Sequence, residues 1–227
     1  MTRRRTVSLT CMSLIALLGS GLSTVSAQLG QRSAQEYIDS MERPERVADL
    51  KIDEIIGALE LKPGDIVADI GSASGIFSIP MARAIGPTGT LYAVDIDKDM
   101  LDYVVNRAKK EGVANVRTAL GEYNDPKLPV RNVDVAFFHS VLHMIEHRQA
   151  YLNAVAKYLK PDGRIVVIDR NPEHVTGWMW LKQSDVDSWM AAISFYPAQQ
   201  FHLFDTKYFV VYQRPYGNSI LLKRRSR

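Results

Sequence analysis

The segment Val67-Ala68-Asp69-Ile70-Gly71-Ser72-Ala73-Ser74-Gly75 decides the fold of this chain. An apolar run ends in Asp69, two glycines four residues apart frame a bend, and a segment with helical spacing follows. A strand, a glycine-containing turn and a helix in this order let the backbone approach a ligand closely. Midway between the glycines, where a cofactor-binding loop usually has a third glycine, stands Ala73. The segment therefore predicts an α/β fold with a ligand-binding turn. Because of Ala73, the sequence leaves open whether the turn still binds a cofactor.

Apolar runs and helical patterns alternate along the rest of the chain. Residues 34–61 have helical spacing, and we expect further helices over 75–85, 100–111, 148–159 and 184–193, the last capped by Ser184. Strands are predicted over 66–70, 91–95, 116–120, 133–138, 165–168, 201–204 and 208–212. The inner strands are apolar on both faces and the connections are short. This pattern predicts a mostly parallel sheet with helices on both faces and an antiparallel hairpin at its C-terminal edge.

The first 27 residues differ from the rest of the chain. Three arginines, Arg3 to Arg5, precede an uncharged apolar stretch over residues 7–22, and Val25-Ser26-Ala27 has the small residues that a signal peptidase reads. The stretch is short for a membrane span, so a secretory signal peptide cleaved before Gln28 is predicted. The alternative is an uncleaved membrane anchor over residues 7–22. The protein is expected to be periplasmic or secreted.

Removal of that segment changes the charge and cysteine content. The formal charge of +3 comes from its three arginines, so the remaining chain has equal numbers of acidic and basic residues. The single cysteine, Cys11, is removed as well, which leaves no disulfide or thiol chemistry. A neutral chain without an added basic module argues against nucleic acid as a partner. The rest is predicted to be a helical segment over 28–60 and one α/β domain over 61–227.

Polar residues stand where the predicted strands end. In a parallel sheet these ends share one edge, and ligands bind there at the point where the strand order reverses. The acidic Asp95 closes the second strand, 24 positions after Gly71, where a carboxylate would hold a ribose diol. Proteins that bind dinucleotides and proteins that bind S-adenosylmethionine both have this arrangement of a glycine-containing loop and an acidic residue. A dinucleotide site has the spacing G-x-G-x-x-G, whereas Gly71 to Gly75 fits G-x-G-x-G with the middle residue changed.

At this point the sequence resembles the class I S-adenosylmethionine-dependent methyltransferases, and within them the small-molecule branch that includes ubiquinone and menaquinone biosynthesis enzymes. The resemblance runs from about Leu61 to Arg170, with a similar ending over 207–211. It rests on Val67-Ala68-Asp69-Ile70-Gly71 with Gly75, Tyr92-Ala93-Val94-Asp95-Ile96-Asp97, Leu128-Pro129, Val133-Asp134-Val135 and Leu159-Lys160-Pro161-Asp162-Gly163-Arg164. It implies a Rossmann-like, seven-stranded sheet and S-adenosylmethionine as cofactor.

The resemblance also implies roles for individual residues. Asp69 and the backbone of the loop, including Gly71, Ser72, Ala73 and Gly75, would hold the methionine end of the cofactor. Asp95 would bind the ribose hydroxyls, Ile96 would lie against the adenine face, and Glu122 would bind the adenine amino group. The family more often has a shorter acid-bearing segment near Glu122. Ala73 also departs from the family pattern. If the backbone at this position needs a positive φ, alanine would lower the affinity for the cofactor; if its φ is negative, alanine fits without cost.

Three histidines follow the fourth central strand at spacings of four. His139 ends the strand, and His143 and His147 are expected to share a helical turn beside Glu146. A metal site is one interpretation, but neutral histidines at the surface or in the pocket are the preferred one, and no metal is predicted. If the protein is a methyltransferase, His139 and His143 lie near the transferred methyl group. Either could act as a general base for an oxygen or nitrogen nucleophile.

Three functions are consistent with these patterns. The leading hypothesis is an S-adenosylmethionine-dependent methyltransferase that acts on a small molecule. The second is a non-catalytic binding protein on the same scaffold, which Ala73 and the export signal favour because the cofactor is made in the cytoplasm. The third is a nucleotide-dependent oxidoreductase, which the loop spacing opposes. A membrane partner is expected only through a retained signal segment.

Overall fold

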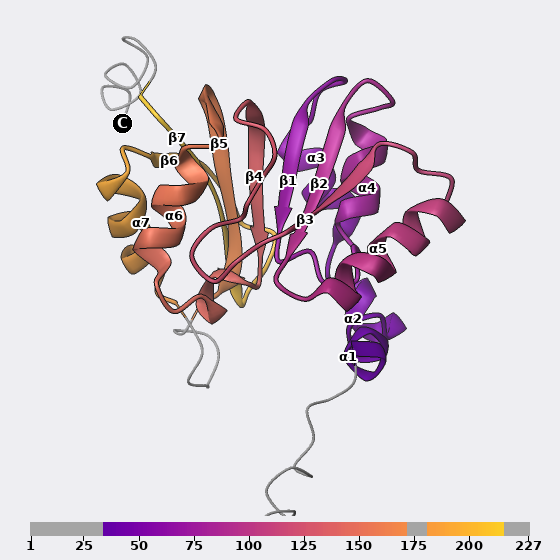
Figure 1. Ribbon diagram of the computed structural model, residues 1–227. Coiled ribbons are helices and arrows are strands. Elements are labelled where there is room, and N and C mark those ends of the chain that lie inside the picture. The colour runs from indigo at the N-terminus through magenta and orange to yellow at the C-terminus, as the bar shows by residue number, and fades with distance from the viewer. Residues whose placement is uncertain (1–33, 172–180, 216–227) are drawn as a thin grey trace, which may run out of the picture. The chain divides into compact units, whose positions relative to one another are not determined.

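The computed structural model describes residues 34–171 and 181–215, so the predicted signal peptide lies outside the described residues. Seven strands form one sheet in the order β3-β2-β1-β4-β5-β7-β6 (Figure 1). Neighbouring strands from β3 to β5 are parallel, and β7 runs antiparallel to both β5 and β6. The strands are β1 (Ile66–Ile70), β2 (Thr90–Asp95), β3 (Val116–Leu120), β4 (Val133–His139), β5 (Leu159–Arg170), β6 (Tyr196–Phe201) and β7 (Lys207–Gln213). The predicted Rossmann-like fold is confirmed.

Helices cover both faces of the sheet. Figure 1 shows α3, α4 and α5 beside β1 to β3, and α6 and α7 beside β5 to β7. Alternate residues of β1 face different helices: Val67 packs in a cluster with residues of α3, α4 and α5, whereas Ala68 and Ile70 pack in a cluster with α6 and α7. The helices are α3 (Ile52–Leu59), α4 (Ser78–Ala84), α5 (Lys98–Lys110), α6 (Arg148–Ala156) and α7 (Gln183–Ala192). This two-sided burial explains why the inner strands have no polar face.

The strand order reverses beside β1. The chain goes from β1 outward to β2 and β3, and then crosses to β4 on the other side of β1. The loops that leave the carboxyl ends of β1 and β4 therefore diverge, which opens the crevice where ligands bind in sheets of this type. Asp69, near the end of β1, is paired in register with Ala93 of β2 and Phe137 of β4.

The N-terminal helical segment is broken into three helices. These are α1 (Ala34–Met41), α2 (Pro44–Ala48) and α3. Pro44 begins α2, as expected for a residue that lacks the N–H of the first helical turn. Lys51 has a left-handed φ of 51° directly before α3 and separates it from α2. Residues 34–61 are therefore helical but do not form one continuous helix.

Two strand boundaries differ from the prediction. The penultimate strand is β6 over Tyr196–Phe201, not residues 201–204, and its exposed, polar sequence carries no apolar signal because it is the edge of the sheet. The segment Lys160-Pro161-Asp162-Gly163 belongs to β5 instead of only ending a helix. It bulges, so that Leu159 pairs with Val133 while Arg164 pairs with Val135.

The predicted cap of the last helix is also wrong. The residue that precedes α7 is Lys182, and it makes no side-chain capping bond. Ser184 lies inside the first turn, where its carbonyl oxygen accepts a hydrogen bond from Ser188 Oγ at 2.8 Å. A serine near a helix start is a capping residue only if the chain leaves helical geometry at that residue.

Candidate active site

The loop after β1 bends over the end of β2. The backbone N–H groups of Gly71 and Ser72 both donate to the carbonyl oxygen of Val94, at 2.8 and 2.9 Å. The N–H of Gly75 then donates to the carbonyl oxygen of Ser72 at 2.8 Å and closes the turn. The loop is therefore held by its own backbone against the neighbouring strand, and it turns directly into α4.

Three alternate positions of this loop have a left-handed backbone. The φ angles are 69° at Gly71, 46° at Ala73 and 73° at Gly75. A Cβ atom at Gly71 would come within 2.3 Å of Val141 Cγ2, and one at Gly75 would lie 3.0 Å from Val104 Cγ2. The structure thus answers the question that the sequence raised: the middle position requires a positive φ, and Ala73 adopts it although this conformation costs an L-residue about 1–2 kcal/mol.

Asp95 ties this loop to the second strand. One carboxylate oxygen accepts the backbone N–H of Ala73 at 2.9 Å, and the other accepts the N–H of Asp97 at 3.1 Å. Burial raises the pKa of Asp95, and these backbone hydrogen bonds act in the opposite direction. The loop that follows β1 and the acidic residue that ends β2 are therefore in direct contact.

Asp69 is a buried acid beneath the loop. Its side chain is 3% exposed and accepts a hydrogen bond of 2.5 Å from Ser78 Oγ, in the first turn of α4. Burial raises the pKa of Asp69 to about 7; the Ser78 hydrogen bond lowers it and the nearby Asp95 raises it. A cationic group of a ligand near Asp69 would favour its charged form.

A cavity of about 690 Å³ opens at the carboxyl ends of β1, β2 and β4. This volume is typical of sites for cofactors and other small molecules. Eight of the predicted site residues line it: Asp69, Gly71, Ser72, Ala73, Asp95, Ile96, Glu122 and His139. Ile96 is 51% exposed, which leaves an apolar surface at the cavity available to a flat ring. Glu122 is more exposed and forms an ion pair with Lys127 at 3.3 Å.

Two predicted site residues do not line the cavity. Gly75 packs against Val104 of α5, where the absence of a side chain permits close approach of the loop to the helix. The His143 side chain is directed to Asp169, with its Nδ1 atom 2.9 Å from the carboxylate Oδ1. Asp169 is fully buried at the end of β5. His143 is thus the one of the two proposed bases that does not line the cavity.

The predicted helical turn shared by two histidines is also corrected. His143 lies in a short 3₁₀ turn, Leu142–Met144, and His147 is the residue that precedes α6. Within residues 34–171 and 181–215, no group of three or more His, Cys, Asp or Glu side chains is placed to hold a metal ion. The same ranges contain no helix long and apolar enough to cross a membrane.

His139 lies where apolar and cationic groups meet. Its ring packs on Phe77 with the ring centroids 4.5 Å apart, and Lys207 Nζ lies 3.4 Å from its Nε2 atom. Burial lowers the pKa of His139 well below its usual value, and the charges of Lys207, Arg46 and Arg170 lower it further. His139 is therefore a neutral imidazole at physiological pH, in the protonation state that a base requires.

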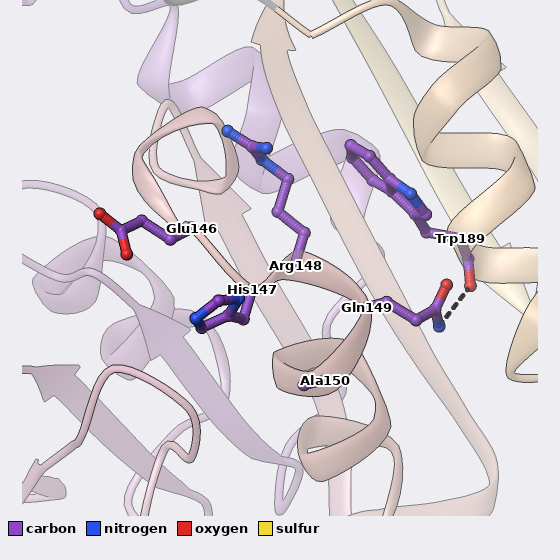
Figure 2. Close-up of a pocket in the computed structure, with 6 residues that line it drawn as sticks. All are labelled: Glu146, His147, Arg148, Gln149, Ala150 and Trp189. Carbon is purple, nitrogen blue, oxygen red and sulfur yellow. Dashed lines mark hydrogen bonds between the residues drawn. The ribbon is translucent and has the colours of Figure 1, made fainter.

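Arg148 holds the turn between β4 and α6 in place. Its guanidinium group donates to the carbonyl oxygens of Leu142 at 3.1 Å and His143 at 2.7 Å, and lies 5.6 Å from the Trp189 ring centroid. Figure 2 shows Arg148 and Trp189 in a second, shallower pocket, with the Gln149 amide bonded to the Trp189 carbonyl oxygen. Through these contacts α6 and α7 fix the segment that forms one wall of the main cavity.

Several residues of the cavity were not predicted from the sequence. They are Tyr37, Met41, Arg46 and Leu50 from the N-terminal helices, and Ser140, Val141, Met144, Ile145, Glu146, His147 and Tyr151 after β4. The helices α1 and α2 showed only helical spacing, and no local pattern indicated that they border the site. Nothing in the sequence distinguishes Arg46 from the other charged residues of its segment, such as Arg43.

The chain belongs to the methyltransferase-domain family, because the sequence model of that family matches residues 61–205. Curated relatives include nocamycin O-methyltransferase of Saccharothrix syringae, 29% identical over 49% of this chain and 40% of the relative. The ubiquinone/menaquinone biosynthesis C-methyltransferase UbiE of Ectopseudomonas mendocina is 30% identical over 48% of this chain and 43% of the relative. The aligned part thus covers less than half the length of these relatives.

Solved structures share the fold at low sequence identity. An S-adenosylmethionine-dependent methyltransferase from Aquifex aeolicus superposes with a TM-score of 0.73 and 20% identity, over 79% of this chain and 98% of that protein. The [4+2]-cyclase SpnF superposes with a TM-score of 0.64 and 13% identity, over 75% of this chain and 82% of SpnF. Family and fold together support S-adenosylmethionine as the cofactor.

The residues of the cavity fit that cofactor. Gly71, Ser72 and Ala73 line the wall, and Ser72 has a buried hydroxyl without a hydrogen-bond partner in the described part of the chain. A buried hydroxyl in a cavity wall is a ready donor or acceptor for a ligand, since leaving it unpaired is costly. Acidic groups lie at two depths, with Asp69 buried and Asp95 nearer the opening. This arrangement suits a ligand that has both an ammonium group and hydroxyls.

Proposed function

We propose that the protein is an S-adenosylmethionine-dependent methyltransferase that acts on a small-molecule acceptor. The observation that carries the proposal is the contact between the loop and Asp95: the Ala73 N–H donates to the Asp95 carboxylate although Ala73 must adopt a left-handed φ. Alanine at the middle position is therefore compatible with a loop that contacts Asp95. The O- and C-methyltransferase names of its relatives support a small molecule as the acceptor.

In this proposal each acidic residue holds one part of the cofactor. The Asp95 carboxylate accepts the ribose hydroxyls, Ile96 packs against the adenine, and Glu122 accepts its amino group. Asp69 and the loop backbone hold the methionine end. When bound, S-adenosylmethionine supplies an electrophilic methyl group, and the walls of the cavity orient the acceptor toward it.

We further propose that His139 accepts the proton of the acceptor's nucleophilic group. Its place in the cavity wall supports this role, and its lowered pKa, which burial and the neighbouring cations cause, keeps the ring unprotonated at neutral pH while making it a weaker base. His143 is not assigned a role in proton transfer, because it does not line the cavity.

Calorimetric titration of S-adenosylmethionine and S-adenosylhomocysteine into the purified protein tests the proposal. We expect micromolar dissociation constants and at least tenfold weaker binding in Asp95→Asn, since the amide would place a donor where a carboxylate oxygen accepts hydroxyl protons. Asp102→Asn is the control, because Asp102 is an exposed acid on α5 that pairs with Lys98. Absence of binding at millimolar ligand would contradict the proposal.

The second candidate is a non-catalytic binding protein on the same scaffold. The left-handed backbone of Ala73 favours it, because alanine stands at a position of the loop where a cofactor-binding pattern has a glycine. Cofactor binding without methyl transfer to any member of a phenol, amine and carboxylate acceptor panel would favour this candidate. Transfer of a labelled methyl group to any of them would exclude it.

We also propose that the protein is exported. The support is the sequence alone: Arg3 to Arg5, the uncharged stretch at 7–22 and the small residues before Gln28. N-terminal mass analysis after cell fractionation tests this. Export with cleavage gives a soluble protein that begins at Gln28, a retained anchor gives the intact chain in the membrane fraction, and an intact chain in the cytoplasm would contradict export.

A further inference from the structure

Two cationic side chains, those of Arg46 and Lys207, lie at or beside the wall of the cavity. Arg46 of α2 and His139 of β4 both line the cavity, and Lys207 Nζ lies 3.4 Å from the His139 ring. Arg170 is directly opposite Lys207 in the register of β5 and β7. Arg46 and Lys207 lie close enough for the charge of Arg46 to lower the pKa of Lys207, so a bound anion would reduce the repulsion between these two side chains.

Within the described residues, the carboxylates whose charge reaches Lys207 form no ion pair with Arg46 or Lys207. Asp169 is fully buried and accepts hydrogen bonds from His143 and from the backbone N–H of Arg170. Asp49, the other acid whose charge reaches Lys207, is exposed on the surface. Among the described residues, neither Arg46 nor Lys207 forms an ion pair with a carboxylate.

The remaining contacts of the two cations leave them able to bind an anion. The Arg46 guanidinium donates one hydrogen bond of 2.6 Å to the Met41 carbonyl oxygen, which orients it but adds no negative charge. Lys207 Nζ lies 4.9 Å from the Phe204 ring centroid. Burial lowers the pKa of Lys207 to about 8, with Arg170 and Arg46 lowering it and Asp169 and Asp49 raising it. An anion at this position would favour the charged form.

The walls next to these cations are largely apolar. Phe77 packs on His139, and Met41, Leu50 and Met144 line the same cavity. A ligand group held here would therefore combine an apolar body with a charged end.

We propose that Arg46 and Lys207, beside His139, form a binding subsite for an oxyanion, a carboxylate or phosphate, on an otherwise apolar acceptor molecule. This inference rests on the proposed methyltransferase function for its biological meaning, but the subsite itself is testable without catalysis. It narrows the acceptor from any small molecule to a small organic acid or phosphate ester. It also places the charged end of the acceptor next to the proposed base.

Probe binding in the presence of saturating S-adenosylhomocysteine tests the subsite. Benzoate, phenyl phosphate and benzamide are titrated at pH 7 and followed by ligand-observed NMR. Benzamide has the shape of benzoate but no charge, so we expect it to bind at least tenfold more weakly. Whichever anion binds more tightly identifies the source of the oxyanion. Equal binding of all three probes, or binding of none, would overturn the proposal.

Variants locate the subsite. Arg46→Gln and Lys207→Gln are each expected to weaken binding of the preferred anion at least tenfold. Arg46→Lys and Lys207→Arg should retain most of it because they keep the charge. The controls are Arg117→Gln and Lys157→Gln, which remove exposed cations from other surfaces. Thermal unfolding of each variant separates loss of the subsite from loss of the fold, and unchanged anion binding in both glutamine variants would contradict the assignment.

The pH dependence of anion affinity tests whether Lys207 belongs to the subsite. Lys207 loses its proton as the pH rises above about 8, so anion affinity in the wild type should fall between pH 7 and pH 10. Binding of the anion itself shifts this fall to higher pH, because it stabilises the protonated lysine. In Lys207→Arg the affinity should stay constant over the same range. An identical fall in that variant would remove Lys207 from the subsite.

A cofactor comparison distinguishes failure of this inference from failure of the proposed function. If the protein does not bind S-adenosylhomocysteine, the proposed function fails, and the probes titrated alone still test the subsite. If Arg46→Gln weakens S-adenosylhomocysteine but not 5′-methylthioadenosine, which has no carboxylate, and leaves probe binding intact, the cations hold the cofactor and the acceptor proposal is wrong.

Discussion

Ala73 shows how one methyl group can be accommodated in a loop that requires a left-handed backbone. Its φ of 46° is positive, like those of Gly71 and Gly75, and its N–H donates a hydrogen bond to the Asp95 carboxylate. The hydrogen bond and the surrounding turn hold the residue in a conformation that it would not adopt alone. The strain is local and does not remove the contact that defines the loop.

Ala73→Gly should therefore relieve strain. The left-handed conformation costs alanine about 1–2 kcal/mol, and glycine loses about 0.5–1 kcal/mol in chain entropy, so we expect a net gain of roughly 1 kcal/mol or less. Cofactor affinity should stay the same or rise. Urea unfolding and calorimetry measure both. Ala150→Gly, in an exposed helical position of α6, is the matched control and should lose up to about 1 kcal/mol.

Asp69 makes the stability of the ligand-free protein depend on pH. Its folded pKa of about 7 is above its ordinary value of 3.8, so the folded state binds more protons than the unfolded state between these two pH values. The contribution of Asp69 to stability is thus fully present below pH 4 and is lost as the pH rises through 7.

Asp69→Asn should remove this dependence. The amide oxygen can still accept the Ser78 hydroxyl, but the side chain has no charge to bury. Relative to the wild type, the variant should gain stability steadily from pH 4 to pH 8 in urea unfolding. Its cofactor binding should weaken, because the proposed partner of the ammonium group is lost. Parallel stability curves for the two proteins would show that Asp69 titrates normally.

At the scale of the elements, the site depends on how closely two loops approach each other. The loop after β1 passes against Val141, which follows β4, and Gly71 leaves space for it. This contact joins the two sides of the crevice at the reversal of strand order. Arg148 and Trp189 hold the segment after Val141 from the other side.

Gly71→Ala should displace one of these two loops. The new Cβ atom would lie 2.3 Å from Val141 Cγ2, and the φ of 69° adds backbone strain. We expect a loss of roughly 2–4 kcal/mol in unfolding free energy and severe loss of cofactor binding. Gly112→Ala is the control, because its φ is 68° but no atom lies within 4 Å of the added Cβ. It should cost only about 1–2 kcal/mol; equal losses would show that the close approach does not matter.

At the scale of the whole molecule, the sheet brings together groups that are far apart in the sequence. Asp69, Asp95, Glu122 and His139 lie at or just beyond the carboxyl ends of four strands, and the cavity adds Arg46 from α2. A ligand bound across these elements connects most of the domain, and it therefore stabilises the folded state as a unit.

S-adenosylhomocysteine should raise the unfolding temperature of the protein. At one hundred times its dissociation constant, a ligand that binds only the folded state contributes about 2.7 kcal/mol. For a domain of this size the shift should be roughly 5–10 °C. Differential scanning fluorimetry measures it. The same concentration of NAD should give no shift, since the loop lacks the dinucleotide spacing; a shift with NAD alone would revive the oxidoreductase hypothesis.

The sequence determined the architecture of the central sheet. Its inner strands are apolar on both faces, and β1 and β4 begin and end within a residue of the prediction, because two-sided burial gives a continuous apolar signal. The exposed edge strand β6 was misplaced for the opposite reason, since its side chains face solvent. The acids at the strand ends were predicted to lie near one another because parallel strands share their carboxyl edge.

Only the tertiary structure decided what these residues contact. The φ of Ala73, the direction of His143 toward Asp169, and the electrostatic effect of Arg46 on Lys207 depend on segments up to 161 positions apart. Local spacing predicts which face of an element a residue occupies, but it does not contain the packing of one loop against another. The sequence by itself therefore determined the sheet and the candidate residues, and the packing of its loops and helices decided which of those residues form the site.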